Sequence, residues 1–504
     1  MAPRKVLGTL GIVLVVLALF MATALPWAWF DAHDAGQEVW PSLKPWLSGI
    51  ILTAGPGLIL GIWGRKRGGH QGALQSIAPL SSDRELSRRE ALVVVTLSWV
   101  FCGIFGGIPF LLDGMVDTPI DALFETVSGV TTTGSTILTD IEAQSRASLW
   151  WRALLQWLGG MGIIVFFLAI FPQAGGGGRK LFEGEVPGPE KELLRPRIAE
   201  TSAVLWRIYG GLTLLAACLY MLEGMSFHDA VCHAFTTLAT GGFSTKSASI
   251  AAFESPLIEA TVTAFMILGG INFALYFSML RRRSLKVLVD TEFLVYCGGG
   301  LLVILVMTIS LVPTYSGDLL TAFRHGAFQA VAIATSTGYA SADFVLWPVF
   351  SQVLLLCLMF VGGMAGSTSG GFKLSRVIIL VGSLLQELRR NIHPRAVFTT
   401  RVGKKPVQEK IVRNVLSLCS LALLTLGLGT LAMTCLGVPL AEAFSATLTA
   451  FSNGGPGLAS IGPAGSFAAL PAAAKGLLAA LMIVGRLEFF TALALLTPGL
   501  WTGK

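Results

Sequence analysis

The sequence VTTTGST at residues 130–136 recurs three more times in altered form along the chain. The other copies are LATGGFS at residues 238–244, ATSTGYA at 334–340 and AFSNGGPG at 450–457. Aligned on Gly134, Gly242, Gly338 and Gly455, each copy has a small polar residue, one further residue and then glycine. The aligned glycines are 108, 96 and 117 residues apart, so the pattern predicts four similar structural units in one chain.

Each copy lies between two long apolar segments and follows a shorter run that can form a helix. The predicted order in each unit is a membrane helix, a half-spanning helix, a polar loop and a second membrane helix. A polar loop without regular hydrogen bonding cannot face lipid, so it must be buried in protein or line a water-filled path. Any single copy could be an ordinary turn. Four copies in the same context favour a ring of loops around one path.

The loops supply candidate cation-binding residues. Small polar residues followed by glycine allow backbone carbonyl oxygens to turn inward, where they can replace the water shell of a cation. The candidates are Thr131, Thr132, Thr133, Gly134, Ala239, Thr240, Gly241, Gly242, Thr335, Ser336, Thr337, Gly338, Ser452, Asn453, Gly454 and Gly455.

The composition indicates a polytopic membrane protein. Of 504 residues, 53% are hydrophobic and only 13% are charged, whereas a soluble domain has about a quarter of its residues charged. The seven cysteines are an odd number without paired spacing, so they predict neither a disulfide framework nor a zinc site.

The apolar segments predict an all-α chain with ten full spans and four half spans. Residues 1–70 form an N-terminal hairpin with spans at Val6–Phe30 and Trp46–Trp63; the alternative for the first is a cleaved signal peptide. The four pore units are expected at residues 85–175, 198–283, 287–390 and 406–504. Their outer helices are predicted near Leu92–Leu112 and Leu149–Phe171, Ala203–Met221 and Leu257–Leu280, Phe293–Val312 and Phe350–Leu385, and Val412–Cys435 and Pro471–Leu496. The half spans are predicted at Asp121–Val130, Phe227–Leu238, Leu319–Ala334 and Ala441–Ala450.

The charges predict the orientation in the cell membrane. With the N-terminus inside, all but seven of the 36 lysines and arginines lie on the cytoplasmic side, so both termini are expected there. The exceptions are Lys44, Arg146, Arg152, Lys246, Arg324, Lys475 and Arg486. Acidic residues gather on the outer side and would form a negative vestibule that attracts cations; the alternative is that they merely complement the positive inner side. They include Asp113, Asp117, Asp121, Glu125, Asp229, Asp318, Asp343 and Glu442.

The second long helix of the third unit contains five glycines in the eleven residues 361–371. Glycine costs about 1 kcal/mol in a helix interior, so we expect the helix to break here. Unwound backbone at membrane depth needs a water-lined cavity, and we interpret the segment as a flexible gate on the cytoplasmic side of the third loop. Close helix packing is the alternative. The gate residues are Gly362, Gly363, Gly366, Gly370 and Gly371.

Arg486 lies within an apolar span, where an isolated charge is expensive and is a candidate for function. An ion pair with Glu488 is the alternative, although residues two apart on a helix do not face each other.

The stretches that carry a family resemblance are TTTGST, ATGGFST, TSTGY, SNGGPGL, the break GGMAGSTSGG and the late GRLEFF. Through them the chain resembles the ion-conducting subunit of the Trk/Ktr/HKT potassium-uptake superfamily, and Trk-type bacterial subunits within it. The resemblance covers essentially the whole chain. It implies K⁺ transport through a selectivity filter in the lipid bilayer, with Arg486 projecting into the pore near the gate. It also implies a homodimer and a cytoplasmic nucleotide-binding regulatory subunit. The basic segments 281–283 and 389–410 would then dock that subunit or serve only as topology determinants.

Other classes of function find less support. The chain has no Walker loop, and it has no HExxH or GxSxG motif, so we expect neither a nucleotide site nor an enzyme. No nucleic-acid partner is expected. A secondary transporter with broken helices is the main alternative. The sequence leaves open K⁺ against Na⁺ preference and coupling to Na⁺ or H⁺.

Overall fold

The computed structural model describes residues 2–65, 86–162, 198–284, 289–393, 395, 398–403 and 405–498. Within these ranges the regular elements are helices, apart from a two-stranded antiparallel hairpin in which β1 (Arg401–Val402) pairs with β2 (Lys405–Pro406). The predicted all-α membrane fold is confirmed. The predicted unit boundaries at residues 70, 85, 175 and 287 lie outside the described residues, and all the boundaries stay predictions.

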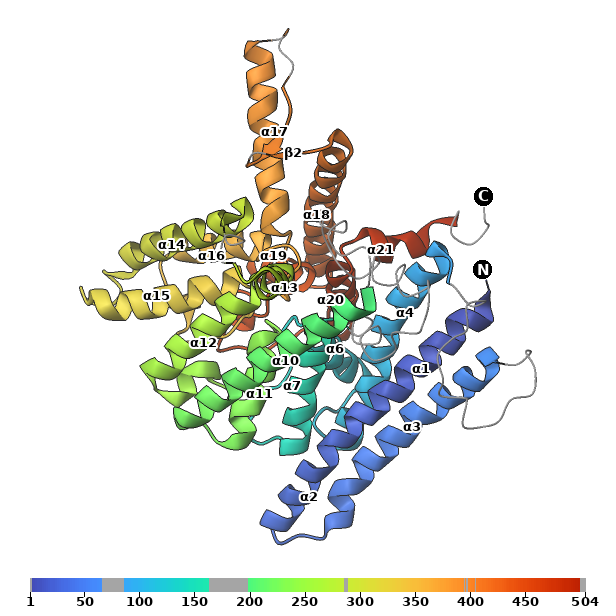
Figure 1. The fold of residues 1–504 in the computed structure, drawn as a ribbon. Coiled ribbons are helices and arrows are strands. Elements are labelled where there is room, and N and C mark those ends of the chain that lie inside the picture. Colours follow the sequence, from blue (N-terminus) through green and yellow to red (C-terminus); the bar gives the residue numbers. More distant parts are fainter. Residues whose placement is uncertain are drawn as a thin grey trace.

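The N-terminal hairpin pairs α1 (Pro3–Met21), η1 (Ala22–Ala24) and α2 (Leu25–Asp34) with the antiparallel α3 (Val39–Arg65), as Figure 1 shows. Glycines allow the two helices to approach closely. A Cβ atom built on Gly64 would lie 2.6 Å from the Cα of Gly8, and one on Gly11 would lie 2.5 Å from the carbonyl oxygen of Gly57. Small residues at such a crossing are typical of helix pairs in membranes.

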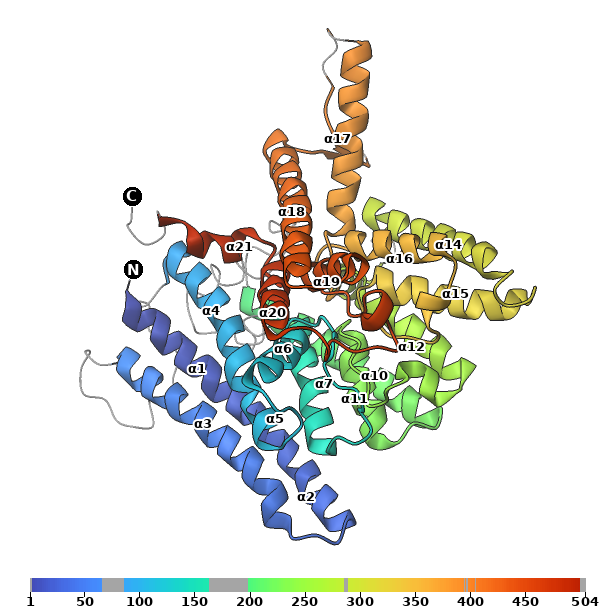
Figure 2. The same cartoon turned by 180° about the vertical axis from the view of Figure 1, so that it is seen from behind.

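Four units of the same order follow the hairpin (Figures 1 and 2). The first helix or helix pair of each unit is α4 (Arg88–Gly106) with α5 (Ile108–Leu112), then α10 (Ile198–Leu222), α14 (Thr291–Leu311) and α18 (Glu409–Cys435). The short helices are α6 (Pro119–Val130), α11 (Phe227–Leu238), α15 (Leu319–Ala334) and α19 (Leu440–Ser452). The last helices are α7 (Arg146–Gly160), α12 (Pro256–Gly269) with α13 (Phe273–Arg282), α16 (Val349–Val361) with α17 (Leu374–Ile392), and α20 (Ala472–Arg486) with α21 (Phe490–Leu493). Single 3₁₀ turns are η5 (Ser249–Phe253), η7 (Phe344–Leu346), η8 (Ala459–Ile461) and η9 (Ala494–Leu496).

Polar caps fix where three of the short helices begin. Thr118 accepts a hydrogen bond from the backbone N–H of Asp121, and Ser226 does the same for Asp229. Asp318 caps the third short helix by accepting from two backbone N–H groups. These caps satisfy N–H groups that the first helical turn leaves unpaired, so the sequence sets the start of each half span.

In every unit the last helix ends or bends before its predicted end, which corrects the prediction of continuous spans outside the third unit. The predicted helix Leu149–Phe171 ends at Gly160, and residues 163–171 lie outside the described part. The predicted helix Leu257–Leu280 is bent by 83° between α12 and α13. The predicted helix Pro471–Leu496 ends at Arg486. Only the break in the third unit, at residues 362–373, was expected.

The outside of the bundle is apolar. Six of the described helical segments are long and apolar enough to cross a membrane, or seven with the bent pair α12 and α13. On α14 the side chains of Leu301 and Ile309 are each 64% exposed, although both are aliphatic. Such a surface suits lipid rather than water, and the chain is a multi-pass membrane protein.

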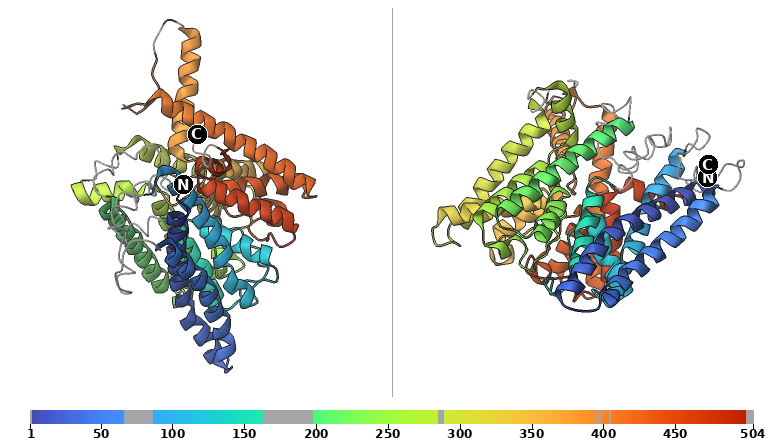
Figure 3. Two further views of the ribbon diagram at one scale, coloured as in Figure 1. Left: turned by 90° about the vertical axis from the view of Figure 1, so that its right-hand side faces the viewer. Right: turned by 60° about the horizontal axis from the view of Figure 1, so that its bottom comes forward.

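Buried side chains join the units around a common centre. One cluster combines the hairpin with the first and fourth units, a second lies mainly within the second unit, and a third combines the third and fourth units. Helix α17 projects away from this packed centre, and the left view of Figure 3 shows the projection from another direction. The four polar loops lie in the centre.

Candidate functional site

The four loops meet in a closed cycle. A Cβ atom built on Gly134 would lie 2.1 Å from the carbonyl oxygen of Gly241, in the second loop. One built on Gly242 would lie 1.9 Å from the carbonyl oxygen of Thr337, in the third loop. The same construction on Gly338 gives 2.8 Å to Gly454 O, and on Gly455 it gives 3.2 Å to Thr133 O. Each central glycine therefore lies beside the carbonyl group that precedes the next central glycine, and the fourth contact returns to the first loop.

The loops also share one backbone conformation. The residue two before each central glycine has a positive φ although it is not glycine: 56° at Thr132, 51° at Thr240, 53° at Ser336 and 53° at Asn453. The central glycines have φ values of 82°, 77°, 79° and 91°. Non-glycine residues rarely adopt this region, and it persists only where the surroundings enforce it. A side chain at any central glycine would be strained as well as crowded.

In each of the first three units, the residue nine positions before the central glycine forms a hydrogen bond with a residue that follows that glycine. In the first loop, the carboxylate of Glu125 accepts from the backbone N–H of Ile137 at 2.9 Å. In the second, a ring nitrogen of His233 lies 3.0 Å from the hydroxyl of Ser244. In the third, Gln329 Oε1 accepts from the N–H of Ser341 at 3.3 Å.

The fourth loop is held by the neighbouring position instead. Ala446 occupies the place nine before Gly455, and Ser445 accepts the N–H of Leu458 at 3.0 Å. The supporting role of these residues was not predicted from the sequence. A fixed offset from the central glycines is the signal that could have found it.

Arg152 joins the first two loops. Its Nε donates to Glu125 Oε1 at 2.8 Å, and the two side chains are 2% and 0% exposed. The guanidinium also donates to the carbonyl oxygen of Ser244 at 3.2 Å and to the hydroxyl of Thr136 at 3.1 Å. Its carbon lies 3.9 Å from the centre of the Phe243 ring. The prediction that Glu125 is a vestibule charge is therefore wrong, because Arg152 neutralises it in the interior.

Two polar contacts close the seam between the fourth and first loops. The hydroxyl of Ser135 donates to the carbonyl oxygen of Gly455 at 2.7 Å. The amide of Asn453 donates to Thr133 Oγ1 at 2.9 Å and to the carbonyl oxygen of Met482 at 3.0 Å. Because both seam residues are buried, these bonds fix the spacing of the loops.

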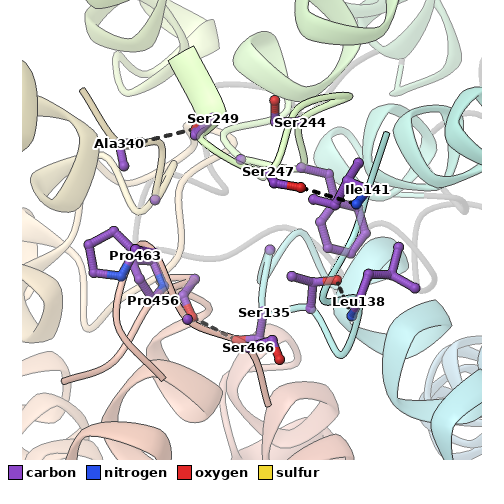
Figure 4. A pocket seen from close by; sticks show the side chains of 18 of the residues that line it. Ser135, Leu138, Ile141, Ser244, Ser247, Ser249, Ala340, Pro456, Pro463 and Ser466 are labelled. Atoms are coloured by element: carbon purple, nitrogen blue, oxygen red, sulfur yellow. Dashed lines mark hydrogen bonds between the residues drawn. The ribbon is translucent and has the colours of Figure 1, made fainter. Parts of the chain in front are cut away.

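A cavity of about 200 Å³ lies against one side of the ring. All four central glycines line it, together with loop residues that follow them, and Figure 4 shows Ser135, Ser244, Ala340 and Pro456 around it. Across it, the N–H of Ile141 donates to Ser247 at 3.1 Å and the N–H of Ala340 donates to Ser249 at 3.2 Å.

The charged side chains among the residues lining this cavity are Arg152 and Lys246, so the expected acidic lining is not found there. Several of the acids serve other contacts instead. Asp113 accepts from Ser145 and Ser148, and Asp121 pairs with Lys475. Asp318 and Asp343 cap helices.

Glu142 holds the rim of this cavity. Its carboxylate accepts from the N–H and the hydroxyl of Ser247, which lines the cavity. Burial alone would raise the pKa of Glu142, but the hydrogen bonds from Ser247 outweigh it and the pKa lies below its usual value. The carboxylate is therefore ionised at neutral pH, and it links the segment after the first loop to the segment after the second.

The glycine-rich break in the third unit lies against the opposite side of the loops. The N–H of Gly371 donates to the carbonyl oxygen of Ser452 at 2.7 Å, and the N–H of Gly370 donates to the hydroxyl of Ser336. The hydroxyl of Thr368 donates to the carbonyl oxygen of Leu238 at 2.9 Å. The segment therefore contacts the ends of three of the short helices.

The neighbouring break between α12 and α13 holds the same segment. The N–H of Met364 donates to the carbonyl oxygen of Gly270 at 3.1 Å, and the N–H of Phe273 donates to that of Gly366 at 3.0 Å. Gly362, Gly366 and Gly371 have positive φ values of 72°, 73° and 78°. A side chain on Gly363 would lie 2.3 Å from Ser369 Oγ. The glycines are thus needed for the fold of the segment itself.

Arg486 reaches this segment from the fourth unit. It donates to the carbonyl oxygen of Thr368 at 3.0 Å and to those of Gly159 and Gly160 at 2.8 and 3.1 Å. Glu488 instead pairs with Arg376 of α17. A second cavity, of about 130 Å³, is lined by Arg486, Lys373 and Asn453 among others. The structure therefore brings Arg486 and the glycine-rich segment together, and Asn453 of the fourth loop lines the same cavity.

The fold and the site define a class: a polytopic helical membrane protein with four like units, whose polar loops form a central ring. The profile of the TrkH family, described as cation transport proteins, matches residues 72–498. The chain belongs to this family.

Individual relatives cover most of the chain. The Trk system potassium uptake protein TrkH of Salmonella typhimurium is 41% identical over 421 residues, which are 83% of this chain and 87% of the relative. The protein of the same name from Halomonas elongata is 39% identical over 435 residues, covering 85% and 89%. The crystal structure of the potassium transporter TrkH from Vibrio parahaemolyticus matches with a TM-score of 0.82 and 34% identity, covering 99% of this chain and 100% of that one.

Proposed function

We propose that the protein carries potassium ions into the cell across the cell membrane through the ring of four loops. The observation that carries the proposal is the closed cycle in which each central glycine lies beside the carbonyl group of the next loop. Related proteins over most of the chain are potassium uptake proteins by name. Backbone oxygens arranged around one axis are the ligands that replace the hydration shell of K⁺.

In this proposal the ion enters from the cavity above the central glycines and binds between the loops. The ligands belong to the sixteen residues identified in the sequence, from Thr131 to Gly134 and their counterparts in the other loops. The glycine-rich segment at residues 362–371 acts as a gate below them, with Arg486 as a positive barrier beside it. Its hydrogen bonds to the ends of the short helices support this role, because they hold the segment across the inner side of the loops.

The same proposal includes orientation and partners. Both termini lie on the cytoplasmic side, as the distribution of lysine and arginine indicates. The protein forms a homodimer and binds a cytoplasmic nucleotide-binding regulatory subunit, which are implications of the family resemblance. The ion is not a resident cofactor; it is the transported substrate.

The test of the ring replaces one central glycine. In Gly134→Ala the new methyl group meets Gly241 O at 2.1 Å and the residue must keep a φ of 82°, so the two loops must separate. We expect the ratio of K⁺ to Na⁺ flux to fall by about tenfold, because the spacing of the ion ligands sets selectivity. The measurement is radiotracer uptake with ion competition in potassium-starved cells.

The matched control is Gly211→Ala in α10, because a Cβ there meets nothing within 4 Å. It should leave the K⁺ to Na⁺ ratio unchanged. A native ratio in Gly134→Ala, at normal protein levels, would refute the assignment of the ring as the filter.

The secondary-transporter alternative expects one broken helix in each of two halves. The interruptions lie in all four units instead and do not single out two halves. A K⁺ flux that requires a coupling ion at every concentration would favour this alternative.

A further inference from the structure

Gln156 of α7 brackets the central glycine of the second loop. Its Nε2 donates to the carbonyl oxygen of Gly241 at 2.7 Å, and its Oε1 accepts from the N–H of Phe243 at 3.0 Å. The side chain is completely buried. One amide group thus binds the backbone immediately before and immediately after Gly242, although it belongs to the first unit.

The three other units carry methionine at the equivalent place. In the first unit Gln156 lies three residues before Gly159. A Cβ atom built on Gly159 would lie 1.8 Å from the carbonyl oxygen of Val130, the residue four positions before the central glycine. Likewise, a Cβ atom built on Gly269 would lie 3.3 Å from the carbonyl oxygen of Leu238, and one built on Gly485 would lie 2.0 Å from that of Phe451. The helix of the third unit ends just before Gly362. The residues three before these glycines are Met266, Met482 and Met359, and each is buried.

Met359 shows that the equivalent position faces the next loop in another unit too. A Cβ built on Gly454 would lie 2.7 Å from Met359 Cγ, and one on Gly241 would lie 2.4 Å from Gln156 Cδ. Gly241 and Gly454 each come directly before a central glycine. A thioether can only pack against that backbone, whereas an amide donates to it and accepts from it.

The second loop needs this restraint because of its own sequence. The first and third loops have threonine before the central glycine, and the hydroxyl of that residue lies 2.7 or 2.8 Å from a threonine hydroxyl two residues earlier. The second and fourth loops have two consecutive glycines, which have no side chains of their own to make such a contact. In the fourth loop Pro456 follows and fixes its own φ. In the second loop the residue that follows is Phe243, and the backbone on both sides of Gly242 is held by Gln156.

We propose that Gln156 is a positioning residue that sets the selectivity of the ring by fixing the Gly241 carbonyl group and the N–H of Phe243. This inference rests on the proposed function of the ring. It makes the four loops unequal: one carbonyl oxygen of the second loop is engaged by a side-chain amide from outside the loop. Loss of that amide frees the Gly241–Gly242 peptide to rotate and widens the choice of cations.

The test exchanges Gln156 for the residue that the other units use. In Gln156→Met, purified and reconstituted in liposomes, we expect the K⁺ to Na⁺ flux ratio to fall by about fivefold to tenfold, as the loss of one or two backbone hydrogen bonds permits. K⁺ flux itself should change by less than about twofold, because the ring carbonyls remain. Gln156→Leu, which is apolar and of similar size, should behave in the same way and serves if the methionine variant aggregates.

Met266→Leu is the matched control at the equivalent buried position of the second unit, and it should keep the native ratio. Thermal unfolding of each variant is measured in parallel. If both Gln156 variants unfold earlier but keep the native flux ratio, the role of Gln156 is only structural and the inference is overturned. Gly134→Ala, included in the same assay, separates the two claims: a native ratio there overturns the proposed function of the ring itself.

Discussion

Arg152 and Glu125 show how single side chains support the ring. Two opposite charges are buried together, and each also hydrogen-bonds loop backbone or a loop hydroxyl. Desolvating an ion pair is expensive, and the pair is tolerated only where further hydrogen bonds satisfy both partners. Here the bonds to Ile137 and Ser244 meet that condition and connect the first loop to the second.

Removing one partner of this pair should lower the free energy of unfolding more than removing both charges. Arg152→Met leaves the Glu125 carboxylate buried without a cation, which costs about 3–5 kcal/mol. Adding Glu125→Gln removes that charge and keeps an oxygen to accept the N–H of Ile137. We therefore expect the double variant to unfold at a higher temperature than Arg152→Met alone, measured by intrinsic fluorescence in detergent. A double variant that is less stable than either single one would contradict this account.

The breaks in the last helices place backbone against the ring, on the side opposite the cavity. The segment at residues 362–373 is folded, with its N–H groups directed to Ser336, Ser452 and the neighbouring break at Gly269–Gly270. Several backbone hydrogen bonds hold this segment, so the opening of the proposed gate would have to break several of them together.

Gly370→Ala tests that packing. The added methyl group would lie 2.1 Å from the carbonyl oxygen of Ser452, so it pushes the segment away from the fourth loop. We expect K⁺ flux to rise by about threefold to tenfold, since about 1 kcal/mol of lost contact shifts a closed–open equilibrium by that order. Flux is measured in liposomes. Gly299→Ala in α14, where a Cβ meets nothing within 4 Å, is the control and should conduct normally. Reduced or native flux in Gly370→Ala would argue against a closed gate.

The sequence predicted the short helices well because their signals are local. Phe227–Leu238 and Leu319–Ala334 were predicted with the bounds that the structure gives. It also predicted the break with five glycines. The breaks after Gly160 and Gly269 were missed, since each carries only two adjacent glycines, an ordinary content for a membrane helix. At both places a glycine lies close to the end of the short helix of its own unit, at Val130 and Leu238, and such contacts do not show in one-dimensional sequence.

The supports of the ring were missed for a related reason. Arg152 and Gln156 lie on α7 and His233 lies on α11, and nothing in the sequence says which loop each one meets. The same limit explains the vestibule prediction. A count of acidic residues by side of the membrane predicts negative charge outside. Several of these acids cap helices, form ion pairs or accept hydrogen bonds instead of lining the cavity.

For the whole molecule, charged residues join every pair of neighbouring units in the cycle. Arg152 of the first unit binds the carbonyl oxygen of Ser244 in the second. Arg324 and Glu259 join the third and second units through two bonds of 2.7 Å. Arg376 and Glu488 join the third and fourth, and Lys475 binds Asp121 at 2.7 Å to close the fourth onto the first. One chain thus closes a ring with an ion pair at three seams and an arginine–carbonyl hydrogen bond at the fourth.

The ion pair between Lys475 and Asp121 joins the fourth unit to the first, and a single substitution removes it. The two side chains are 9% and 17% exposed, so the bond is shielded from water and salt far more than a surface pair. Lys475→Met should therefore lower the free energy of unfolding by about 2 kcal/mol, the value of a hydrogen bond between charged groups. Asp121→Asn in the same chain should recover part of it, because the unpaired carboxylate is then neutral. Thermal unfolding in detergent gives both numbers, and Lys44→Met, at an exposed lysine of α3, is the control. Equal stability of the Lys475 and Lys44 variants would show that the contact between the first and fourth units is held by apolar packing alone.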